Sequence, residues 1–276
     1  MTALDTKEIE LLSVRGDNLS RRSDHLAAEE PMEVRVEGPG QSEVRIAVTM
    51  RTPGHDDELA VGFLFTEGLV KQRDDVAERP MRELVVADGR GNVVTVRLTK
   101  PFDSERLKRN FYTTSSCGIC GKASLEQVEV VAPHIAAGPV VERAVLLGLP
   151  PALRASQAVF EQTGGLHASG LFDTAGNLLA MREDVGRHNA LDKLIGRMFL
   201  DRKVPLSEHI LMVSGRASFE LVQKAAMAAI PILCAVSAPS SLAVQLADRL
   251  GITVVGFLRG DGFNIYTHPG RIAMGA

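Results

Sequence analysis

The sequence predicts a mixed α/β fold (α/β or α+β), in which a sheet is flanked by helices and preceded by a smaller strand-rich region. In the second half of the chain, short apolar runs alternate with turn signals and amphipathic stretches, a pattern typical of a sheet covered by helices. In the first third, apolar and polar residues alternate on both sides of glycine-containing turns, which predicts hairpins. With 276 residues and a hydrophobic content of 45%, the chain can build one large or two smaller domains around a substantial core.

The first 112 residues divide into two expected regions. Residues 1–30 are polar, and we expect a loosely ordered N-terminal segment there. Residues 31–112 are expected to form a strand-rich domain. The runs EVRVEG and SEVRIAVTM flank a GPGQ turn, and RELVV and VVTVRLTK flank ADGRGN, so each pair predicts a hairpin. Between the hairpins, HDDELAVGFLFTEG predicts one helix that Asp56 or Asp57 can cap and that ends near Gly68.

Residues 126–276 are expected to form the larger α/β domain. LRASQAVFEQTGG predicts a helix and LHASGLFDTAGNLLAM a hairpin. DVGRHNALDKLIGRMFL predicts an amphipathic helix with Leu191, Leu194, Ile195 and Met198 on one face. The strand-like runs HILMVSG and PILCAVSAP are each followed by a helical stretch, and ITVVGFLRGDGFNIYTH predicts a closing hairpin. This order predicts a largely parallel or mixed sheet.

Charge and cysteine content limit where the protein works and what it binds. A net charge of -3 gives no general attraction to nucleic acid or to an anionic membrane. The N-terminus lacks the pattern of a signal peptide, and no apolar run approaches the length of a membrane-spanning helix. Three cysteines cannot all pair within one chain, which fits a reducing compartment. We therefore expect a cytoplasmic protein that binds neither nucleic acid nor membrane.

The first candidate site is the stretch 113–125, which contains Cys117 and Cys120 in a C-x-x-C spacing with a glycine beside each. A structural zinc site needs about four ligands, and neither a second cysteine pair nor a close histidine pair is present. Cys234 stands alone in the apolar run PILCAV, where we expect a buried, inert thiol. Glycines let a partner approach the sulfur, and Lys122 favours a thiolate. We expect a mobile loop that performs thiol chemistry; the alternative is a turn with incidental cysteines.

The second candidate is GGLHASG, which contains His167. Zinc deaminases use an H-x-E motif followed by a C-x-x-C pair, and the glutamate moves protons. Here Ser169 stands at the glutamate position, and the cysteine pair precedes the histidine. The sequence therefore predicts neither deamination nor a bound metal. His167 is either a site residue or a hydrogen-bonded strand histidine.

The third candidate is the start of the helix predicted in REDVGRHNALDKL. The positive side chains there are Arg182, Arg187, His188 and Lys193. Asp184 can cap the helix, whose first N–H groups also favour anions; the alternative is a solvated charged face. The junctions VSGRAS and VSAPSS and the turn FLRGDG, with Arg216 and Arg259, follow successive predicted strands, where α/β folds gather ligands. Together these features predict an anionic ligand with several phosphates.

These stretches together resemble the FdhD family of formate dehydrogenase accessory proteins. The segments that carry the resemblance are, in chain order, RTPGHDDELAVGFLFTEG, NFYTTSSCGICGKAS, GGLHASGLFD, EDVGRHNALDKLIG, SGRASFELVQKAA and GFLRGDGFNIYTHP. The match runs from about Met32 to Ile272, which is nearly the whole chain.

The resemblance implies a sulfur carrier, or sulfurtransferase. Such a protein takes sulfur from a cysteine desulfurase as a persulfide and passes it to the molybdenum of the bis(molybdopterin guanine dinucleotide) cofactor before that cofactor enters formate dehydrogenase. Cys117 matches the persulfide-bearing cysteine and Cys120 its partner. The guanine nucleotide end of the cofactor is expected at Phe257, Leu258, Arg259, Gly260, Asp261 and Gly262. The cofactor is bound as a substrate, and no permanent cofactor is implied.

The same resemblance implies a cytidine deaminase-like fold for the larger domain, and a homodimer. Two other functions stay open. One is a chaperone that holds the cofactor without transferring sulfur, with the cysteines as a redox latch. The other is a zinc-dependent hydrolase or deaminase on the related scaffold. Sulfur labelling and metal analysis would distinguish them.

Overall fold

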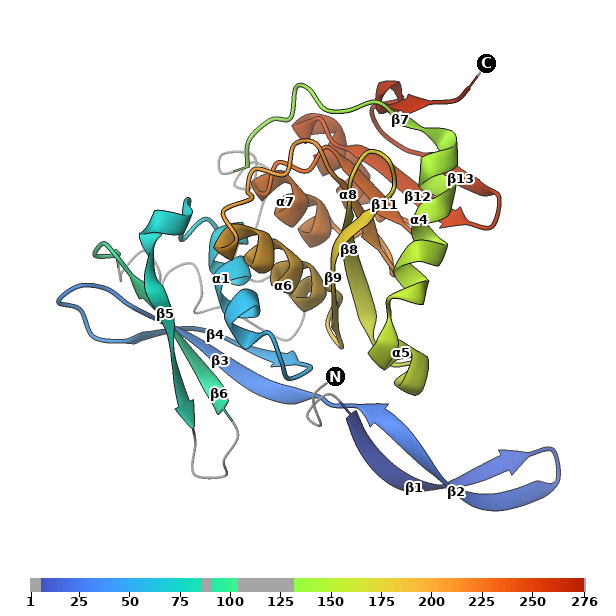
Figure 1. The fold of residues 1–276 in the computed structure, drawn as a ribbon, viewed down its shortest axis with the longest axis horizontal. Coiled ribbons are helices and arrows are strands. Elements are labelled where there is room, and N and C mark those ends of the chain that lie inside the picture. Colours follow the sequence, from blue (N-terminus) through green and yellow to red (C-terminus); the bar gives the residue numbers. More distant parts are fainter. Residues whose placement is uncertain (1–5, 86–90, 104–131, 276) are drawn as a thin grey trace.

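The structure, a computed structural model, describes residues 6–85, 91–103 and 132–275. In these ranges the chain forms a six-stranded sheet, a four-stranded sheet, a separate two-stranded hairpin and a small two-stranded pairing, with helices between and beside the two larger sheets (Figure 1). The predicted mixed α/β class is confirmed. The predicted cysteine loop, 113–125, lies outside the described residues. Within the described ranges, no helix combines the length and the apolar character needed to cross a membrane.

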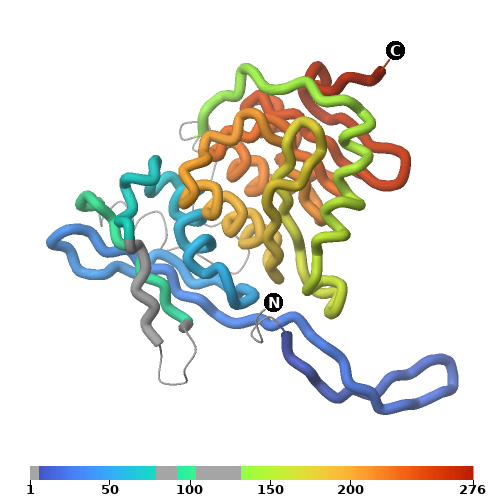
Figure 2. Tube along the Cα trace, viewed as in Figure 1, coloured from blue at the N-terminus to red at the C-terminus, as the bar shows by residue number. Residues whose placement is uncertain are grey.

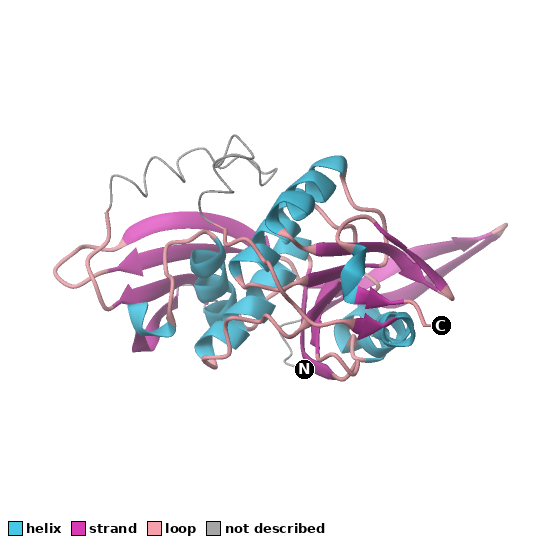
Figure 3. Cartoon of the chain, turned by 90° about the horizontal axis from the view of Figure 1, so that it is seen from above, coloured by secondary structure: helices cyan, strands magenta, loops and turns pink. Residues whose placement is uncertain are grey.

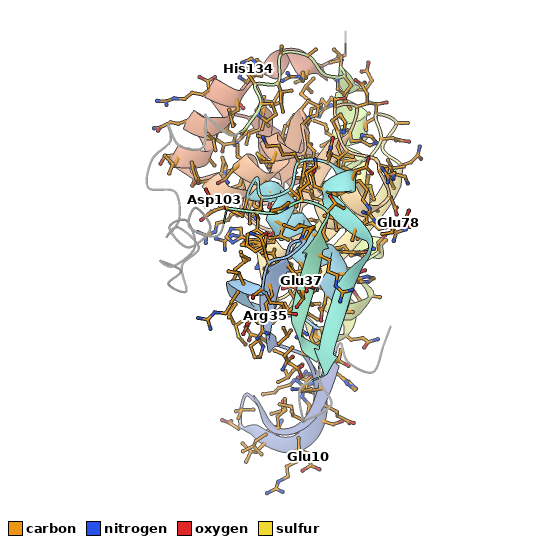
Figure 4. The ribbon with its side chains drawn as sticks, turned by 90° about the vertical axis from the view of Figure 1, so that its left-hand side faces the viewer. Glu10, Arg35, Glu37, Glu78, Asp103 and His134 are labelled. Atoms are coloured by element: carbon orange, nitrogen blue, oxygen red, sulfur yellow. The ribbon has the colours of Figure 1, made fainter. Side chains whose placement is uncertain are left out.

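The N-terminal segment forms a long hairpin rather than the loosely ordered region expected for residues 1–30. Its strands are β1 (Thr6–Arg15) and β2 (Asn18–Ala27), which pair antiparallel along all ten residues. Gly16 adopts a positive φ of 58° in the tight turn between them, which glycine allows at no steric cost. The hairpin projects from the body of the molecule (Figures 1 and 2), and Glu10 on it lies at the opposite end from His134 (Figure 4). Its strands are joined by backbone pairing along their whole length and carry mostly polar residues, so the sequence lacked the apolar alternation that would have predicted them.

The four-stranded sheet has the order β4-β3-β6-β5. Its strands are β3 (Glu30–Glu37), β4 (Val44–Arg51), β5 (Val76–Val85) and β6 (Gly91–Leu98). The two predicted hairpins are confirmed as the antiparallel pairs β3–β4 and β5–β6, and the tip at 86–90 lies outside the described residues. A parallel pairing of β3 with β6 joins the two hairpins.

The predicted helix after the first hairpin is α1 (Asp56–Thr66). Neither Asp56 nor Asp57 caps it: the N-cap residue is His55, in the left-handed region at φ 56°, without a side-chain cap bond. Asp56 instead accepts hydrogen bonds of 2.9 and 2.8 Å from the buried guanidinium of Arg51. A short 3-10 turn, Arg73–Asp75, then leads to β5.

The six-stranded sheet has the order β13-β12-β11-β10-β8-β9. Its strands are β8 (His167–Phe172), β9 (Leu178–Asp184), β10 (Ile210–Val213), β11 (Ile232–Ala235), β12 (Thr253–Arg259) and β13 (Gly262–Ile265). Strands β10, β11 and β12 are parallel, while β8–β9 and β12–β13 are the two predicted hairpins. The predicted mixed sheet is therefore confirmed.

Helices cover both faces of this sheet. On one face lie α6 (Arg187–Leu200), α7 (Phe219–Met227) and α8 (Ser241–Leu250), all of them predicted. On the other lies α4 (Arg143–Ala155), of which only the last residues were predicted, because Pro150 and Pro151 inside it argue against a helix. The prediction of a single helix over LRASQAVFEQTGG is therefore wrong. This stretch contains the end of α4, a break, and a second short helix, α5 (Ala158–Thr163). A 3-10 turn, Pro269–Arg271, follows the six-stranded sheet and leads to the short strand β14 (Ile272–Ala273). This strand pairs parallel with β7 (Val141–Glu142), which precedes α4.

The two larger sheets share one hydrophobic core because α1 and α6 pack closely between them (Figure 3). The helices cross at two glycines. A Cβ atom on Gly62 would collide with the backbone carbonyl of Asp192, and one on Gly196 would collide with that of Glu58. The predicted apolar face of α6 (Leu191, Leu194, Ile195 and Met198) is buried in this core, as expected.

We expect Gly62→Ala to destabilise the protein, because the added methyl group meets rigid backbone rather than a flexible side chain. The loss should be about 1–3 kcal/mol, as for other overpacked cores, and urea unfolding would measure it. Gly148→Ala is the matched control: Gly148 lies in α4 with no neighbouring atom near an added Cβ, so alanine should leave stability unchanged or raise it. Equal effects of the two substitutions would show that the crossing is not tightly constrained.

Candidate functional site

The predicted candidate stretches meet at one edge of the six-stranded sheet. The parallel strands β10, β11 and β12 all end there, and we call this the carboxyl edge. Because β8 runs antiparallel to β10, its first residue, His167, lies at the same edge. Asp184, the last residue of β9, pairs with His167 in the sheet. Sequence segments that are up to about ninety residues apart are therefore neighbours, in the position where ligands gather in open α/β sheets.

Backbone hydrogen bonds join the loops at the carboxyl edge into a continuous surface. The VSAPSS junction donates to the VSGRAS junction through Ser237 N to Gly215 O at 3.3 Å and Ser240 N to Ala217 O at 3.0 Å. The end of β12 then donates to VSAPSS through Phe257 N to Ser237 O at 3.2 Å. The two junctions and the base of the final hairpin are consequently fixed relative to one another.

A buried ion pair determines which charges of the third candidate are available. Asp184 is fully buried and lies 2.7 Å from the Nζ atom of Lys193, which also donates to the carbonyl of Thr52 at 2.8 Å. Burial raises the pKa of Asp184, while Lys193 and the hydrogen bonds that the carboxylate accepts act against this rise. The predictions for these two residues are wrong: Asp184 does not cap α6, whose N-cap is Gly186, and Lys193 lies in the interior.

Arg182 is also paired with a carboxylate, so it is not available to an anionic ligand as the sequence predicted. Its guanidinium donates to both carboxylate oxygens of Glu58, with Nη2 at 2.7 Å from Oε1. Although burial opposes ionisation, the hydrogen bonds from Arg182 and His55 lower the pKa of Glu58 to about 2. The pair links β9 to α1. Of the four positive side chains proposed for this candidate, Arg187 and His188 therefore remain outside the buried ion pairs, although His188 contacts the start of α7.

His188 and the start of α7 form a small polar group. The Nε2 atom of His188 lies 3.2 Å from the Ser218 hydroxyl and 3.5 Å from a carboxylate oxygen of Glu220. Burial opposes the ionisation of Glu220. The hydrogen bonds that its carboxylate accepts from His188 and from the backbone of α7 nevertheless lower the pKa of Glu220 to about 2. The sequence reasoning missed Glu220, because one glutamate after a serine at a helix start is common. Only proximity to His188 distinguishes it.

His167 faces positive neighbours. Burial, followed by the charges of Arg187 and His188, lowers its pKa, while Asp184 opposes this effect. The lowered pKa favours the neutral form of the ring. A Cβ atom at Gly215 would lie 3.3 Å from its Nδ1 atom, so the glycine leaves room beside the ring. Of the two interpretations considered for His167, its position at the carboxyl edge favours a site residue.

The expected nucleotide segment, from Phe257 to Gly262, forms the end of β12 and the turn into β13. Phe257 has a positive φ of 53° at a bulge, and the Arg259 guanidinium lies 5.6 Å from the centre of its ring. Gly260, at φ 60°, and Asp261 form the tip, where Arg143 donates to the Asp261 carbonyl at 3.3 Å. The Leu258 side chain is fully buried, so of this residue only the backbone can meet a ligand.

The cysteines divide into two kinds. Cys117 and Cys120 lie outside the described residues. Cys234, in β11, is fully buried, and burial raises the pKa of its thiol, which confirms the prediction of an inert core cysteine. Across residues 6–85, 91–103 and 132–275, no three histidine, cysteine or acidic side chains are grouped in a way that can hold a metal ion.

Comparison with known proteins agrees with this arrangement of motifs along the chain. The model of the FdhD/NarQ family matches residues 27–273.

The chain is a member of the FdhD/NarQ family.

Curated relatives are similar over almost their whole length. The "Sulfur carrier protein FdhD" of Streptomyces coelicolor is 50% identical over 279 residues, covering 98% of this chain and 97% of that protein. The protein of the same name from Mycobacterium tuberculosis is 51% identical, covering 93% and 94%. The one from Sulfurisphaera tokodaii is 44% identical, covering 98% and 100%. A crystal structure of a protein assigned as a formate dehydrogenase accessory protein, from Desulfotalea psychrophila, is similar in fold, with a TM-score of 0.74 and 27% identity over 97% of this chain and 99% of that one.

The ionised Glu220 makes stability depend on acid pH. A glutamate in the unfolded chain titrates near 4.5, whereas Glu220 in the folded protein titrates near 2, so between these values the unfolded chain binds more protons. The stabilisation is present above pH 4.5 and is lost as the pH falls towards 2. We expect the stability difference between wild type and Glu220→Gln to shrink between pH 6 and pH 3, as measured by urea unfolding.

The exposed Glu29 provides the control for this measurement. Glu29→Gln should follow the wild-type curve at every pH. A stability difference for Glu220→Gln that is as large at pH 3 as at pH 6 would contradict the proposed interaction with His188.

Proposed function

We propose that this protein is a sulfur carrier that receives sulfur from a cysteine desulfurase as a persulfide on Cys117. It delivers the sulfur to the molybdenum of the bis(molybdopterin guanine dinucleotide) cofactor, which it binds as a substrate before the cofactor is inserted into formate dehydrogenase. The observation that carries this proposal is the intact C-x-x-C motif in a chain about 50% identical, over nearly its full length, to proteins named sulfur carriers.

The state of Cys234 supports the choice of cysteine. A persulfide carrier must be attacked once when it receives sulfur and again when it releases it, so the thiol has to be accessible and partly ionised. Cys234 is buried in the sheet, and burial raises the pKa of its thiol, so it meets neither condition. Cys117 and Cys120, with glycines beside them, are the remaining thiols.

The proposed chemistry needs two exchange steps. In loading, the Cys117 thiolate attacks the outer sulfur of the desulfurase persulfide, an S–S bond forms on Cys117, and the desulfurase cysteine leaves as a thiolate. In release, the Cys120 thiolate attacks the inner sulfur, so a Cys117–Cys120 disulfide forms and the outer sulfur leaves as hydrosulfide. A thiol reductant then restores both cysteines. Oxidation of Cys117 and Cys120 to their disulfide supplies the two electrons that convert sulfane sulfur to sulfide.

The carboxyl edge is the proposed location of the cofactor's nucleotide end. The turn from Phe257 to Gly262 offers an exposed arginine and an accessible glycine backbone beside the phosphate-suited loops VSGRAS and VSAPSS. Arg259 provides a planar set of donors for a phosphate or for the edge of a guanine. A local site of this kind accounts for anion binding by a chain whose net charge is -3.

Three further properties belong to the proposal. The larger domain has a cytidine deaminase-like scaffold, on which Ser169 occupies the position of the deaminase glutamate and the chemistry is lost. The protein acts as a homodimer. It works in the cytoplasm, where thiols stay reduced.

Sulfur loading is tested by intact-mass analysis after incubation with a cysteine desulfurase and cysteine. The wild-type mass should rise by at least one sulfur atom and return on reduction, because a persulfide is reducible. Cys117→Ala should not load, whereas Cys234→Ala should load as the wild type does. Labelled sulfur on the Cys117→Ala variant, with formate dehydrogenase still matured, would overturn the assignment.

Nucleotide binding is tested by calorimetric titration with GDP, which represents one nucleotide end of the cofactor. Arg259→Ala should weaken GDP binding by about 1–3 kcal/mol through loss of a charge-assisted hydrogen bond, while sulfur loading on Cys117 stays intact. An unchanged GDP affinity would place the nucleotide elsewhere.

A further inference from the structure

The N-terminal hairpin stands apart from the hydrophobic interior of the protein. We call residues 6–27 the arm; its two ten-residue strands, β1 and β2, form a sheet of their own (Figures 1 and 2). None of its side chains belongs to either hydrophobic core of the described residues. The arm meets the rest of the molecule where α5 contacts β2, and a Cβ atom on Gly165 would lie 3.4 Å from that of Ala27. Because an isolated two-stranded hairpin is at best marginally stable in water, a surface that covers the arm would stabilise it.

Apolar side chains are exposed on one face of the arm, towards its tip. The register of the strands places Val14 opposite Leu19 and Leu12 opposite Arg21. Since side chains alternate along a strand, these four residues share a face, which we call the Leu12 face. Leu12, Val14 and Leu19 are 56%, 66% and 65% exposed. Single exposed apolar residues are ordinary, but three neighbours on a projecting hairpin indicate an interaction surface.

Charge is separated along the arm. The tip half, residues 11–22, contains three arginines and one aspartate, so its net charge is +2. The base half, residues 6–10 and 23–27, contains one lysine and three acidic residues, so its net charge is -2 with histidine neutral. The tip of one arm therefore attracts the base of another.

The same separation is present on the Leu12 face itself. Glu8 and Glu10 lie towards the base and Arg21 towards the tip, and none of the three forms an ion pair with a described residue. Two arms that lie antiparallel, with their Leu12 faces together, bring the acidic base of each towards the arginine of the other and cover the apolar residues of both. A twofold axis makes each of these contacts twice. The face is therefore complementary to itself.

We propose that the Leu12 face of the arm binds the arm of a second copy of this chain, antiparallel about a twofold axis. This inference rests on the homodimer of the proposed function and goes beyond it, because it names the surface that joins the two copies. The observations that carry it are the exposure of the apolar residues and the distribution of charge along the arm.

Charge reversals in the full-length protein test the pairing. Arg21→Glu and Glu10→Arg each place like charges against one another at both symmetry-related contacts of a homodimer. Each variant should raise the dissociation constant of the dimer about tenfold, as measured by sedimentation equilibrium. An equal mixture of the two variants should associate about as tightly as wild type, because every contact in the mixed dimer again joins opposite charges. Interactions within one arm cannot produce this rescue, since each variant arm keeps its own like charges.

Two matched controls separate the arm from the rest of the surface. Arg45→Glu makes the same charge change at an exposed position on β4 and should leave the dissociation constant at the wild-type value. The double variant Leu12→Ser with Leu19→Ser should raise the constant at least tenfold without lowering the thermal midpoint of the monomer, because both side chains are exposed. Leu242→Ser, which changes an exposed leucine of α8, should not raise it.

The outcomes distinguish this inference from the proposed function. If the arm variants dissociate as wild type does, the arms do not join the copies, and the homodimer stands on another surface. If the single variants weaken association but their mixture does not restore it, the charges act within one arm and the inference is wrong. If wild type is monomeric at every concentration, both the inference and the homodimer are wrong, while sulfur loading on Cys117 is unaffected.

A membrane is the alternative occupant of an apolar face beside arginines. Vesicles of phosphatidylserine and phosphatidylcholine test it by co-sedimentation. If the protein is monomeric and sediments with the vesicles, and the variant Leu12→Ser with Leu19→Ser does not, the arm binds a membrane and the inference is overturned. If wild type is a dimer and stays in solution, the result supports a second copy as the occupant.

Discussion

The buried pair of Asp184 and Lys193 is the interaction on which the rest of the architecture depends. Asp184 accepts hydrogen bonds from the backbone of Thr52 at 3.1 Å and of Gly186 at 2.8 Å, and from the side chain of Asn189 at 3.1 Å. These contacts bring together the end of β4, the end of β9 and the start of α6. Removing one member of such a pair leaves an uncompensated buried charge, which costs about 3–5 kcal/mol. The pair therefore holds the two sheets in register at the candidate site.

The close crossing of α1 and α6 extends this constraint through the interior. Because Gly62 and Gly196 let the helix backbones meet, the four-stranded sheet shares a core with the six-stranded sheet. A second buried pair, Lys224 with Asp192 at 2.8 Å, lies beside the crossing. The Thr66 hydroxyl donates a further hydrogen bond to the Asp192 carboxylate. Buried charges are satisfied here by partners from α1, α6 and α7, so the relative position of these three helices is specified by polar contacts as well as by packing.

The use of charge inside the core explains the composition of the carboxyl edge. Lys193 and Arg182 look available in the sequence, but each neutralises a carboxylate that joins separate parts of the fold. Arg187 and His188, within a few residues of them, remain at the carboxyl edge with the loops after β10 and β11. A short segment of β9 and α6 therefore supplies both the structural ion pairs, through Arg182 and Lys193, and the side chains that lie at the carboxyl edge.

The sequence by itself determined the class of fold, the order of most strands and helices, the inert Cys234 and the family. These follow from local patterns, because hydrophobic periodicity and turn residues act over a few positions. The tertiary structure decided the pairing of β1 with β2, the helix α4 across two prolines, and which charges at REDVGRHNALDKL are buried. It also revealed Glu220 beside His188, some thirty residues away in the chain. Whether a charge is free or paired depends on residues that are distant in sequence, such as Glu58 and Arg182, and no local pattern encodes those encounters.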